Sequence, residues 1–380
     1  MRLQEEIIAD LERILDEKLE VYIFGAGKIG TGIGRELLRL LNIPVNGYCD
    51  TNPQKWQLEI EQEVFCISPQ EVLPRKKKAC FVMLGQYHKA SGLQVVETLG
   101  FDIIINYDEL CSLDMLIDKF MMQCDESSNM QEIFDKKRKF LEMHEDEGGY
   151  KVPNLEKKKI AVYTCIAGGY DDVIEPEVIS NECDYYLISD NRPENLNVFQ
   201  WLDINKVVPD WVEDSRRQNR YCKIKVEKIF SEYQFSIYID GNVKIVHDIS
   251  NYIDRIGKSG FATHLHAYNN CLYVEAIKVI AAKVEDERIV KAQVKQYRKE
   301  GMPRDFGQFQ NAILVRENNN PICKKLMADW WREVFVKSYR DQLSLTYCLW
   351  KNNIDKNDIG ILGNDMRGNS DFVWVKRHHI

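Results

Sequence analysis

A glycine-rich turn between a short apolar strand and a helix constrains the fold of this chain most. The strand is predicted over residues 21–24, the turn GAGKIG occupies residues 25–30, and a helix is predicted over residues 31–41. In this order the G-x-G-x-x-G spacing is typical of a dinucleotide-binding βαβ unit, because glycines let the backbone approach a phosphate at the positive end of a helix. The residues expected to contact NAD or another nucleotide are Gly25, Gly27, Lys28, Ile29, Gly30 and Asp50, the acid that ends the next strand.

Alternating strands and helices continue through the first 110 residues. Strands are predicted over residues 45–49, 79–84 and 102–106, and helices over residues 3–15 and 91–99. This alternation predicts an α/β fold class, with a Rossmann-like doubly wound sheet as the N-terminal domain, residues 1–110. Two interpretations of the turn stay open: it binds a nucleotide, or its glycines only let the helix pack closely on the strand.

A helical, highly charged segment separates this domain from the next. Residues 111–157 carry the run DKKRK at 135–139, and Gly148-Gly149 and Pro153 then interrupt the chain. Such a spacer followed by glycine and proline is typical of a domain boundary. The second domain is expected to span residues 158–380 and to fold around its own core, which also suits a length of 380 residues.

Composition and charge exclude several classes of protein. The net charge of −8 and the pI near 5.6 argue against nucleic acid as a partner. The eleven cysteines are scattered without a CxxC pair or zinc-site spacing, so reduced thiols and a cytoplasmic location are expected. The charged first 20 residues are unlike a signal peptide, and no apolar run reaches the ~18 residues that span a bilayer. The sequence is compatible with association with a membrane surface. It does not indicate the oligomeric state.

Polar residues follow the apolar strands of the second domain. Strands are predicted over residues 160–165 and 183–190, and each runs into a loop or an acid at its carboxyl end. Ligands of open α/β sheets bind outside the carboxyl ends of the strands, so these polar residues are expected to line one crevice. The residues expected there are Thr164, Tyr170, Asp171 and Asp190.

A basic helix leads into a further strand that ends in an acid. Residues 214–223 are predicted to open a helix with Asp214 or Ser215 as its cap, and the spacing places three cations on one face: Arg216, Arg220 and Lys223. They form either a solvated face or a set of charges beside a diphosphate. The strand over 235–239 ends in the tripeptide DGN, residues 240–242. This tripeptide is either a hairpin turn or a rigidly held carboxylate at the mouth of a cleft.

Several uncommon motifs of the second domain carry a family resemblance. They are AVYTCIAGGYD (161–171), CDYYLISD (183–190), SRRQNRYCKI (215–224), SIYIDGNVKI (236–245), HLHAYNNCLYVEA (264–276), ADWW (328–331) and SYRDQLS (338–344). Together they resemble a glycosyltransferase-like domain family of bacteria and plants, whose plant members include seed-mucilage proteins. The turn GAGKIG, with GYCDTNP (47–53) and ISPQEVL (67–73), is similar to a Rossmann-like module of sugar-modifying and polysaccharide-assembly proteins.

The resemblance implies a GT-A-like α/β domain that moves a sugar from a nucleotide-sugar donor to a glycan or lipid-linked acceptor. The setting that it implies is bacterial surface-polysaccharide biosynthesis. It also implies a divalent metal, Mn or Mg, at an Asp-x-Asp element whose place Asp240 and Asn242 take. An amide oxygen brings no charge, so a lower metal affinity is expected. His378 is the implied third ligand, although a terminal His-His pair is also typical of an unordered end.

The resemblance assigns the catalytic roles to three residues: Asp341, Glu275 and His264. Asp341 starts a helix, where it is expected to face the sugar or the acceptor, with the helix cap supplied by Ser338 and Tyr339. The resemblance adds Gln342 on the donor side. Arg316 is expected on that side too, because it ends the apolar strand 312–315 and so lies near the cleft. If the reaction inverts the anomeric centre, Asp341 or Glu275 is the base, and if it retains the centre no base is needed. A core histidine with a satisfied hydrogen bond is the other interpretation of His264.

Two other functions fit parts of the sequence. One is a non-catalytic protein that binds or senses a nucleotide sugar. The other is an NAD-dependent sugar-nucleotide oxidoreductase or epimerase, based on the glycine-rich turn. No Tyr-x-x-x-Lys or comparable acid–base pair accompanies that turn, so the N-terminal domain is expected to perform no redox chemistry.

Overall fold

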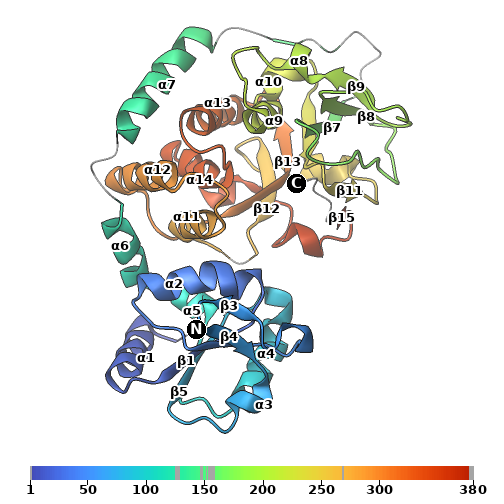
Figure 1. Cartoon of the computed structure of the whole chain (residues 1–380). Helices are drawn as coiled ribbons and strands as arrows, with labels where there is room; N and C mark the ends of the chain where they lie inside the picture. Colours follow the sequence, from blue (N-terminus) through green and yellow to red (C-terminus); the bar gives the residue numbers. More distant parts are fainter. Residues whose placement is uncertain are drawn as a thin grey trace. The chain divides into compact units, whose positions relative to one another are not determined.

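The chain folds into two compact units, each built on its own sheet (Figure 1). The computed structural model describes residues 2–124, 129–145, 149–150, 152, 159–267 and 269–375. Unit 1 comprises Met1–Ser127 and Tyr273–Lys295, and unit 2 comprises Ser128–Leu272 and Gln296–Ile380. This division differs from the expected ranges, because the segment 273–295 of the second expected domain belongs to unit 1. The α/β fold class is confirmed for both units.

Unit 1 contains a doubly wound sheet with the strand order β3-β4-β2-β1-β5-β6. All neighbours are parallel except the β3–β4 pair, which is antiparallel. The order reverses at β1, because β2 and β5 flank it on opposite sides, as the predicted Rossmann-like domain requires. The strands are β1 (Glu20–Phe24), β2 (Gly47–Cys49), β3 (Glu59–Glu61), β4 (Val64–Ile67), β5 (Lys78–Val82) and β6 (Ile103–Asn106).

Helices of unit 1 bury apolar residues at helical spacing. The first of them, α1, buries Ile7, Leu11 and Ile14, which confirms the helix predicted near the N-terminus. The helix after the glycine-rich turn begins as the π-helical segment η1 (Ile29–Gly34) and continues as α2 (Arg35–Leu40). Helix α1 spans Gln4–Asp16, and the remaining helical elements of the N-terminal segment are η2 (Pro53–Lys55), α3 (Pro69–Val72), α4 (Gln86–Glu97), α5 (Tyr107–Cys111) and α6 (Asp114–Met122). Nearly all of α11 (Leu272–Ala281) and most of α12 (Glu287–Lys299) also belong to unit 1.

Unit 2 is built on a mixed seven-stranded sheet with the order β14-β12-β13-β10-β7-β8-β9. Strands β10, β7, β8 and β9 run parallel, whereas β13 is antiparallel to both β10 and β12. The strands are β7 (Ile160–Ile166), β8 (Cys183–Ser189), β9 (Gln200–Asp203), β10 (Phe235–Ile239), β12 (Phe261–Leu265), β13 (Phe309–Glu317) and β14 (Gly360–Ile361). A separate pair joins β11 (Val243–Ile245) to β15 (Phe372–Trp374).

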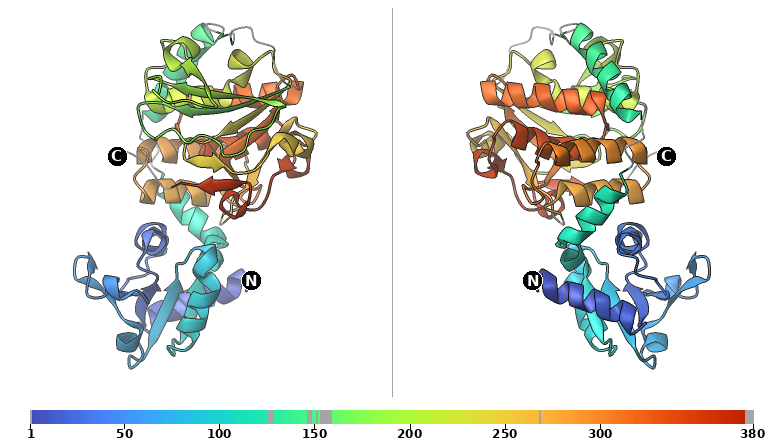
Figure 2. Two further views of the ribbon diagram at one scale, coloured as in Figure 1. Left: turned by 90° about the vertical axis from the view of Figure 1, so that its right-hand side faces the viewer. Right: turned by 90° about the vertical axis from the view of Figure 1, so that its left-hand side faces the viewer.

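Helices of unit 2 lie in layers over this sheet. Helix α9 packs on β7, α14 packs on β13, and α13 lies against both helices and against α7. Figure 2 shows these helices and the sheet from two opposite sides. The helical elements are α7 (Met130–His144), α8 (Ile204–Val207), α9 (Ser215–Ile224), α10 (Val226–Ile229), η3 (Ser250–Arg255), α13 (Pro321–Val336), α14 (Gln342–Lys351), η4 (Lys356–Asp358) and η5 (Met366–Gly368).

Reduced cysteines and the lack of a membrane-spanning apolar run were expected from the sequence. All eleven cysteines lie in the described part of the chain, and each is a free thiol. Burial raises the pKa of Cys66 to about 11, so this thiol stays protonated and unreactive. None of the helices in the described residues combines the length and the apolar character needed to cross a membrane.

Candidate functional site

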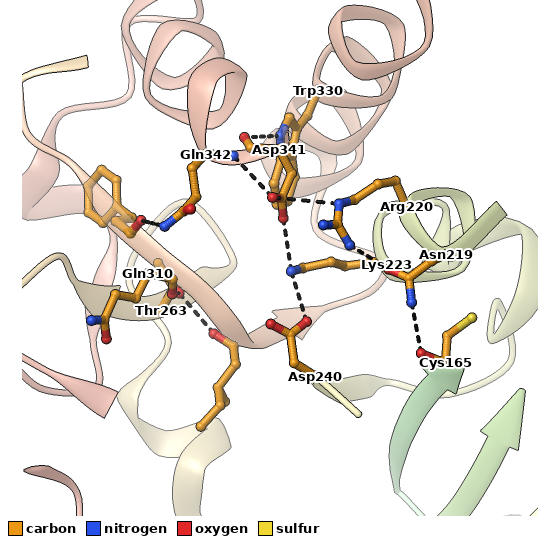
Figure 3. A network of polar contacts seen from close by, with 12 residues as sticks. Cys165, Asn219, Arg220, Lys223, Asp240, Thr263, Gln310, Trp330, Asp341 and Gln342 are labelled. Carbon is orange, nitrogen blue, oxygen red and sulfur yellow. Dashed lines mark hydrogen bonds and ion pairs between the residues drawn. The ribbon is translucent and has the colours of Figure 1, made fainter. Parts of the chain in front are cut away.

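One buried ammonium group joins two carboxylates at the carboxyl end of β10, an inner strand of the unit 2 sheet. Lys223 on α9 places its Nζ 3.1 Å from Oδ1 of Asp240 and 2.9 Å from Oδ2 of Asp341 (Figure 3). Asp240 directly follows β10, and Asp341 directly precedes α14. Lys223 is 1% exposed and Asp341 is 4% exposed, whereas the Asp240 side chain is 32% exposed. The cluster therefore has a closed base and one open carboxylate.

Backbone contacts fix the position of Asp240. Its amide donates to the carbonyl of Ala312 on β13 (2.8 Å), and its carbonyl accepts from the amide of Val243 (3.0 Å). A Cβ on Gly241 would lie 3.1 Å from Cγ1 of Ile166 and 3.4 Å from Oδ2 of Asp171, so the glycine allows the loop after β7 to approach. The hairpin interpretation is wrong, because β11 pairs with β15 and not with β10.

Two cations determine the charge of Asp341. Besides Lys223, Arg220 on the same helix places its Nε 3.6 Å from Oδ1 of Asp341. Burial would raise the pKa of this carboxyl, but the charges of Arg220 and Lys223 outweigh it and hold the pKa well below its ordinary value. Asp341 is therefore a stable anion and a weak base. It also caps α14 itself by accepting from the amide of Gln342 (3.1 Å), so the predicted cap at Ser338 and Tyr339 is wrong.

The three predicted cations of α9 divide into two groups. Lys223 and Arg220 converge on the acids, so the solvated-face interpretation fails for them. Arg216 lies instead at the rim, where its side chain is 64% exposed and its guanidinium lies over the ring of Tyr339, 4.6 Å from the centroid. Asn219 ties the helix to the sheet by donating to the carbonyl of Cys165 (2.8 Å).

The loops after β7 and β8 reach the same edge of the sheet. These parallel strands pair Ile166 with Ser189, so their carboxyl ends lie side by side next to that of β10. Asp190 accepts from the amide of Gly168 (2.6 Å) and thereby holds the loop that carries Tyr170 and Asp171. Tyr170 is 56% exposed. Thr164 is 7% exposed and its hydroxyl has no hydrogen-bond partner among the described residues.

Three other predicted site residues lie in different surroundings. Arg316 is fully buried and donates to the carbonyl of Lys223 (2.6 Å) and to the hydroxyl of Tyr163 (2.6 Å), so it supports α9 from the sheet. His264 is also fully buried, lies 3.1 Å from the amide of Asn369, and has a pKa that burial lowers to about 4. It is therefore a neutral core histidine. Glu275 belongs to unit 1, where it pairs with Lys278 on the same helix (3.2 Å).

Sequence analysis missed Asn311, which lies one residue from the backbone contact of Asp240. Asn311 precedes Ala312, the residue whose carbonyl holds Asp240. Asn311 is 3% exposed, and within the described part of the chain neither its amide nitrogen nor its amide oxygen has a hydrogen-bond partner. An unpaired buried amide costs about 1–3 kcal/mol for each unsatisfied group, which points to a polar ligand. The signal was an asparagine inside the apolar strand FQNAILVRE.

Two glutamines, Gln308 and Gln342, hold the start of helix α14 to β13 and to the residue before it. Gln342 donates through its side chain to the carbonyl of Phe309 (3.4 Å), and its own carbonyl accepts from Gln308 (2.9 Å). Gln308 in turn accepts from the hydroxyl of Thr346 (2.9 Å). The predicted donor-side residue Gln342 therefore positions Asp341, since the two are consecutive.

The expected metal ligands are only partly described. Asn242 is held next to the C-terminal strand, because its carbonyl accepts from the amide of Val375 (2.8 Å). His378, three positions further along, lies outside the described residues. Within the part of the chain that the structure describes, no three His, Cys, Asp or Glu residues could hold a metal together. Asp240 and Asn242 have three side-chain oxygens between them, and Oδ1 of Asp240 already accepts from Lys223, which leaves two.

The glycine-rich turn of unit 1 is explained largely by packing. Gly25 has a φ of +103°, and a Cβ on Gly30 would lie 1.9 Å from the carbonyl oxygen of Gly25. Asp50 accepts from the amide of Ala26 (2.9 Å) and from the Nζ of Lys55 (2.7 Å), so it fastens the turn. Lys28 is the N-cap of η1, and Ile29 begins this segment.

Gly27 differs from the other two glycines of this turn. A Cβ on Gly27 would meet Nζ of Lys55 at 3.8 Å, and the other glycines meet backbone or packed side chains much closer. Packing therefore does not require a glycine here. A positive charge lies instead where a phosphate would approach the backbone.

Comparisons with known proteins agree with the sequence motifs of unit 2. Residues 141–369 match the family described as TOD1/MUCI70, glycosyltransferase-like domain. A curated relative, the probable hexosyltransferase MUCI70 of Arabidopsis thaliana, is 27% identical over 220 residues, which cover 50% of this chain. The chain spans only 38% of the length of that relative.

Similarities to solved structures are weak. The bifunctional glycosyltransferase WbbM gives a TM-score of 0.33 at 11% identity over 56% of this chain and 40% of its own. Mouse xyloside xylosyltransferase 1 gives 0.26 at 8% identity, over 89% and 83% of the two chains. The Rex-family repressor RSP gives 0.21 at 20% identity, over 27% and 52%. These scores support no further argument. The family match, by contrast, covers more than half of the chain, and the protein belongs to the TOD1/MUCI70 glycosyltransferase-like domain family.

Proposed function

We propose that unit 2 transfers a hexose from a nucleotide-sugar donor to a glycan or lipid-linked acceptor. The observation that carries this proposal is the buried Lys223 that joins Asp240 to Asp341, with Arg220 beside it. Membership of a glycosyltransferase-like family and the hexosyltransferase name of the relative support it. The site is the crevice at the carboxyl ends of β7, β8 and β10, in a domain of GT-A type.

The cations of α9 neutralise the leaving diphosphate. Glycosyl transfer leaves a nucleoside diphosphate, whose charge must be stabilised as the bond breaks. Lys223 and Arg220 are already oriented by Asp341 and Asn219, so little reorganisation is needed when the donor binds. The loop after β7, held by Asp190, contacts the nucleotide, and Arg216 on Tyr339 closes the rim.

Asp341 acts on the sugar as a fixed negative charge. The transition state of glycosyl transfer has oxocarbenium character, which a nearby carboxylate stabilises. The low pKa of Asp341 makes it unsuited to remove a proton from an acceptor hydroxyl. Asn311, with both amide atoms unpaired among the described residues, supplies hydrogen bonds to sugar hydroxyls.

A divalent cation, Mn or Mg, would bind through oxygens of Asp240 and Asn242. His378 would be the third protein ligand. The amide of Asn242 suits a hard cation but adds no charge, so affinity is modest. Such a cation would add charge at the diphosphate. Surface-polysaccharide assembly in a bacterial cytoplasm is the setting that we propose for this reaction.

Unit 1 binds NAD or another nucleotide at the glycine-rich turn without redox chemistry. The ammonium of Lys55 near Gly27 supports this part of the proposal. Gly27→Val should block such a ligand and leave the transferase crevice unchanged. Cofactor fluorescence during titration measures the binding. Steady oxidation or reduction of a nicotinamide cofactor by the intact protein would contradict the assignment.

Nucleotide release from a panel of nucleotide sugars, with and without manganese, tests the transferase. Asp240→Asn should abolish this release because the open carboxylate is lost, while circular dichroism stays unchanged. Asp210→Asn, at an exposed position of the same unit, is the matched control and should retain full release. Normal turnover by folded Asp240→Asn protein would reject the site. Donor binding without release by the wild type would instead identify a nucleotide-sugar sensor.

A further inference from the structure

A second hollow of about 570 Å³ lies in unit 2, away from the Asp240 cluster. Residues from three segments line it: those before β12, the first turns of α13, and the stretch from the end of α14 to η4. The residues that matter to the argument are Lys258, Ser259, Ile322, Lys325, Lys351 and Asp358.

This hollow and the Asp240 cluster lie at opposite ends of the strands of the same sheet. Strand β10 begins at Phe235, which pairs with Glu317 at the end of β13, and Asp240 follows the other end of β10. Strand β12 begins at Phe261, which pairs with Arg316. The residues just before β12 therefore lie at the same end of the sheet as Phe235. The hollow is therefore separate from the proposed transferase site.

Positive charge dominates the wall of the hollow. Three lysines line it against one carboxylate, that of Asp358, which pairs with Lys258 at 4.0 Å. Lys325 is fixed by Asp329 (2.7 Å) and Lys351 by Glu300 (2.6 Å), and neither of these acids is part of the wall. Each ammonium has three donors, and the side chains of Lys325 and Lys351 stay 68% and 54% exposed. Both can therefore donate to an anion without losing the contact that fixes them.

A buried serine is one of the residues that line the hollow. Ser259 is 1% exposed, and its Oγ has no hydrogen-bond partner in the described ranges of the chain. Its amide donates to the carbonyl of Asp358 (2.9 Å), which fixes its position. The next residue, Gly260, has a φ of +72°, and a Cβ there would lie 2.5 Å from the side chain of Asn320. The backbone is therefore shaped to bring Ser259 against the start of α13.

Helix α13 adds a favourable dipole and an apolar surface. It has 16 residues and starts at Pro321, so its positive end belongs to the wall. Ile322 on the first turn is 46% exposed, and Ile354 also lines the hollow. The combination of lysines, a hydroxyl and a helix start suits a phosphate, and the apolar surface suits an attached organic group.

We propose that this hollow is a binding site for the phosphate group of a small molecule. The phosphate accepts from Ser259 and from the lysines, and Ile322 and Ile354 contact the rest of the molecule. A volume of about 570 Å³ is within the range of sites for small molecules. The proposal does not depend on the transferase assignment.

Calorimetric titration of the full chain with inorganic phosphate and with glucose 6-phosphate tests it. Lys325→Gln combined with Lys351→Gln should weaken phosphate binding at least about tenfold. Ser259→Ala should weaken it several-fold while the melting temperature stays equal or rises, because the variant removes a buried unpaired hydroxyl. Tighter binding of glucose 6-phosphate identifies an organic phosphate as the ligand class, and equal binding identifies free phosphate.

Lys324→Gln is the matched control. Lys324 neighbours Lys325 on the same helix and contacts Asn319 (3.0 Å), and it does not line the hollow. Lys324→Gln removes one positive charge, as each substitution of the double variant does, and should leave binding unchanged. An equal loss in Lys324→Gln would show a general effect of surface charge and overturn the proposal. Failure of both probes to bind, or unchanged binding in Ser259→Ala and in the double variant, would overturn it as well.

Discussion

At the scale of single residues, Lys223 is the centre of the site. A buried ammonium is stable only when acids pair with it, and here two acids from distant parts of the sequence do so. Sequence analysis expected Asp240 at the mouth of a cleft and Lys223 beside a diphosphate as one of two interpretations of each, and the family resemblance assigned Asp341 to the sugar or the acceptor. The sequence could not show that one ammonium contacts both acids, because this depends on how α9 and α14 pack on the sheet. Asn311 was missed for a related reason, since burial without a partner is visible only in three dimensions.

Replacing Lys223 by methionine should destabilise the protein strongly. Removing one member of a buried ion pair costs about 3–5 kcal/mol, because the other charge stays buried. Free energies of unfolding from urea titration measure the loss. The double variant Lys223→Met/Asp341→Asn should lose less than the sum of the two single variants, since it removes both charges. Additive losses would show that the two groups do not interact.

Lowering the pH should reduce the difference in unfolding free energy between wild type and Lys223→Met. The pKa of Asp341 is lowered in the folded protein, so its stabilisation is present above the ordinary pKa of an aspartate and is lost as the pH falls. In Lys223→Met the burial of Asp341 is opposed by fewer cations, so its pKa rises and it takes up a proton at a higher pH. The difference in unfolding free energy should therefore shrink from about pH 7 toward pH 4. A constant difference over this range would exclude Asp341 as the coupled group.

Asp341→Asn should reduce turnover much more than it weakens binding of a nucleoside diphosphate. In the proposed function the carboxylate acts on the sugar, while the charges of Lys223 and Arg220 act on the diphosphate. Turnover and binding are measured in parallel by nucleotide release and by calorimetry. Tyr339→Phe is a useful comparison, because it removes the hydroxyl 3.2 Å from Arg216 at the rim and leaves the ring in place. Equal losses of turnover and binding in Asp341→Asn would place this acid at the diphosphate.

At the scale of helices and strands, local patterns predicted much of the fold. Apolar spacing located α1 and β1 closely, and the glycine-rich turn identified the doubly wound sheet of unit 1. Pairings between distant segments could not be predicted, such as β11 with β15, because short strands gain their stability from partners that lie far away in the sequence. The turn also shows that one motif can serve two purposes, since packing requires Gly25 and Gly30 and does not require Gly27.

Gly30→Ala should destabilise unit 1, whereas Gly27→Ala should not. A methyl group on Gly30 would clash with the carbonyl oxygen of Gly25 at 1.9 Å, and this oxygen belongs to the backbone, which cannot move aside as the end of a flexible side chain can. Such overpacking costs about 1–3 kcal/mol or more. The same methyl group on Gly27 meets nothing closer than the mobile end of a lysine, at 3.8 Å. Thermal unfolding of the two variants measures the contrast, and equal melting temperatures would refute the packing explanation.

At the scale of the whole molecule, the two compact units do not follow the order of the sequence. The chain passes from unit 1 to unit 2, returns to unit 1 for Tyr273–Lys295, and enters unit 2 again. The expected boundary near residue 158 separated the N-terminal sheet from everything that follows it. No local pattern marks the return, because the helices α11 and α12 have ordinary apolar faces and nothing in their sequence says which core they join. The expectation that residues 158–380 form a self-contained domain must therefore be tested directly.

A chain shortened to residues 129–380 should be poorly soluble or melt well below the full chain. It retains the segment 273–295 without the rest of unit 1, and this segment carries apolar side chains that are at most 1% exposed, including Val274, Ile277 and Val290. Exposing each such side chain costs about 1.5–3 kcal/mol. Size-exclusion chromatography and thermal unfolding measure the effect. Co-expression with residues 1–127 should restore solubility, because it supplies the missing core. A soluble, monomeric 129–380 chain with the melting temperature of the full protein would show that this segment needs no part of unit 1, and that the earlier boundary describes the protein better.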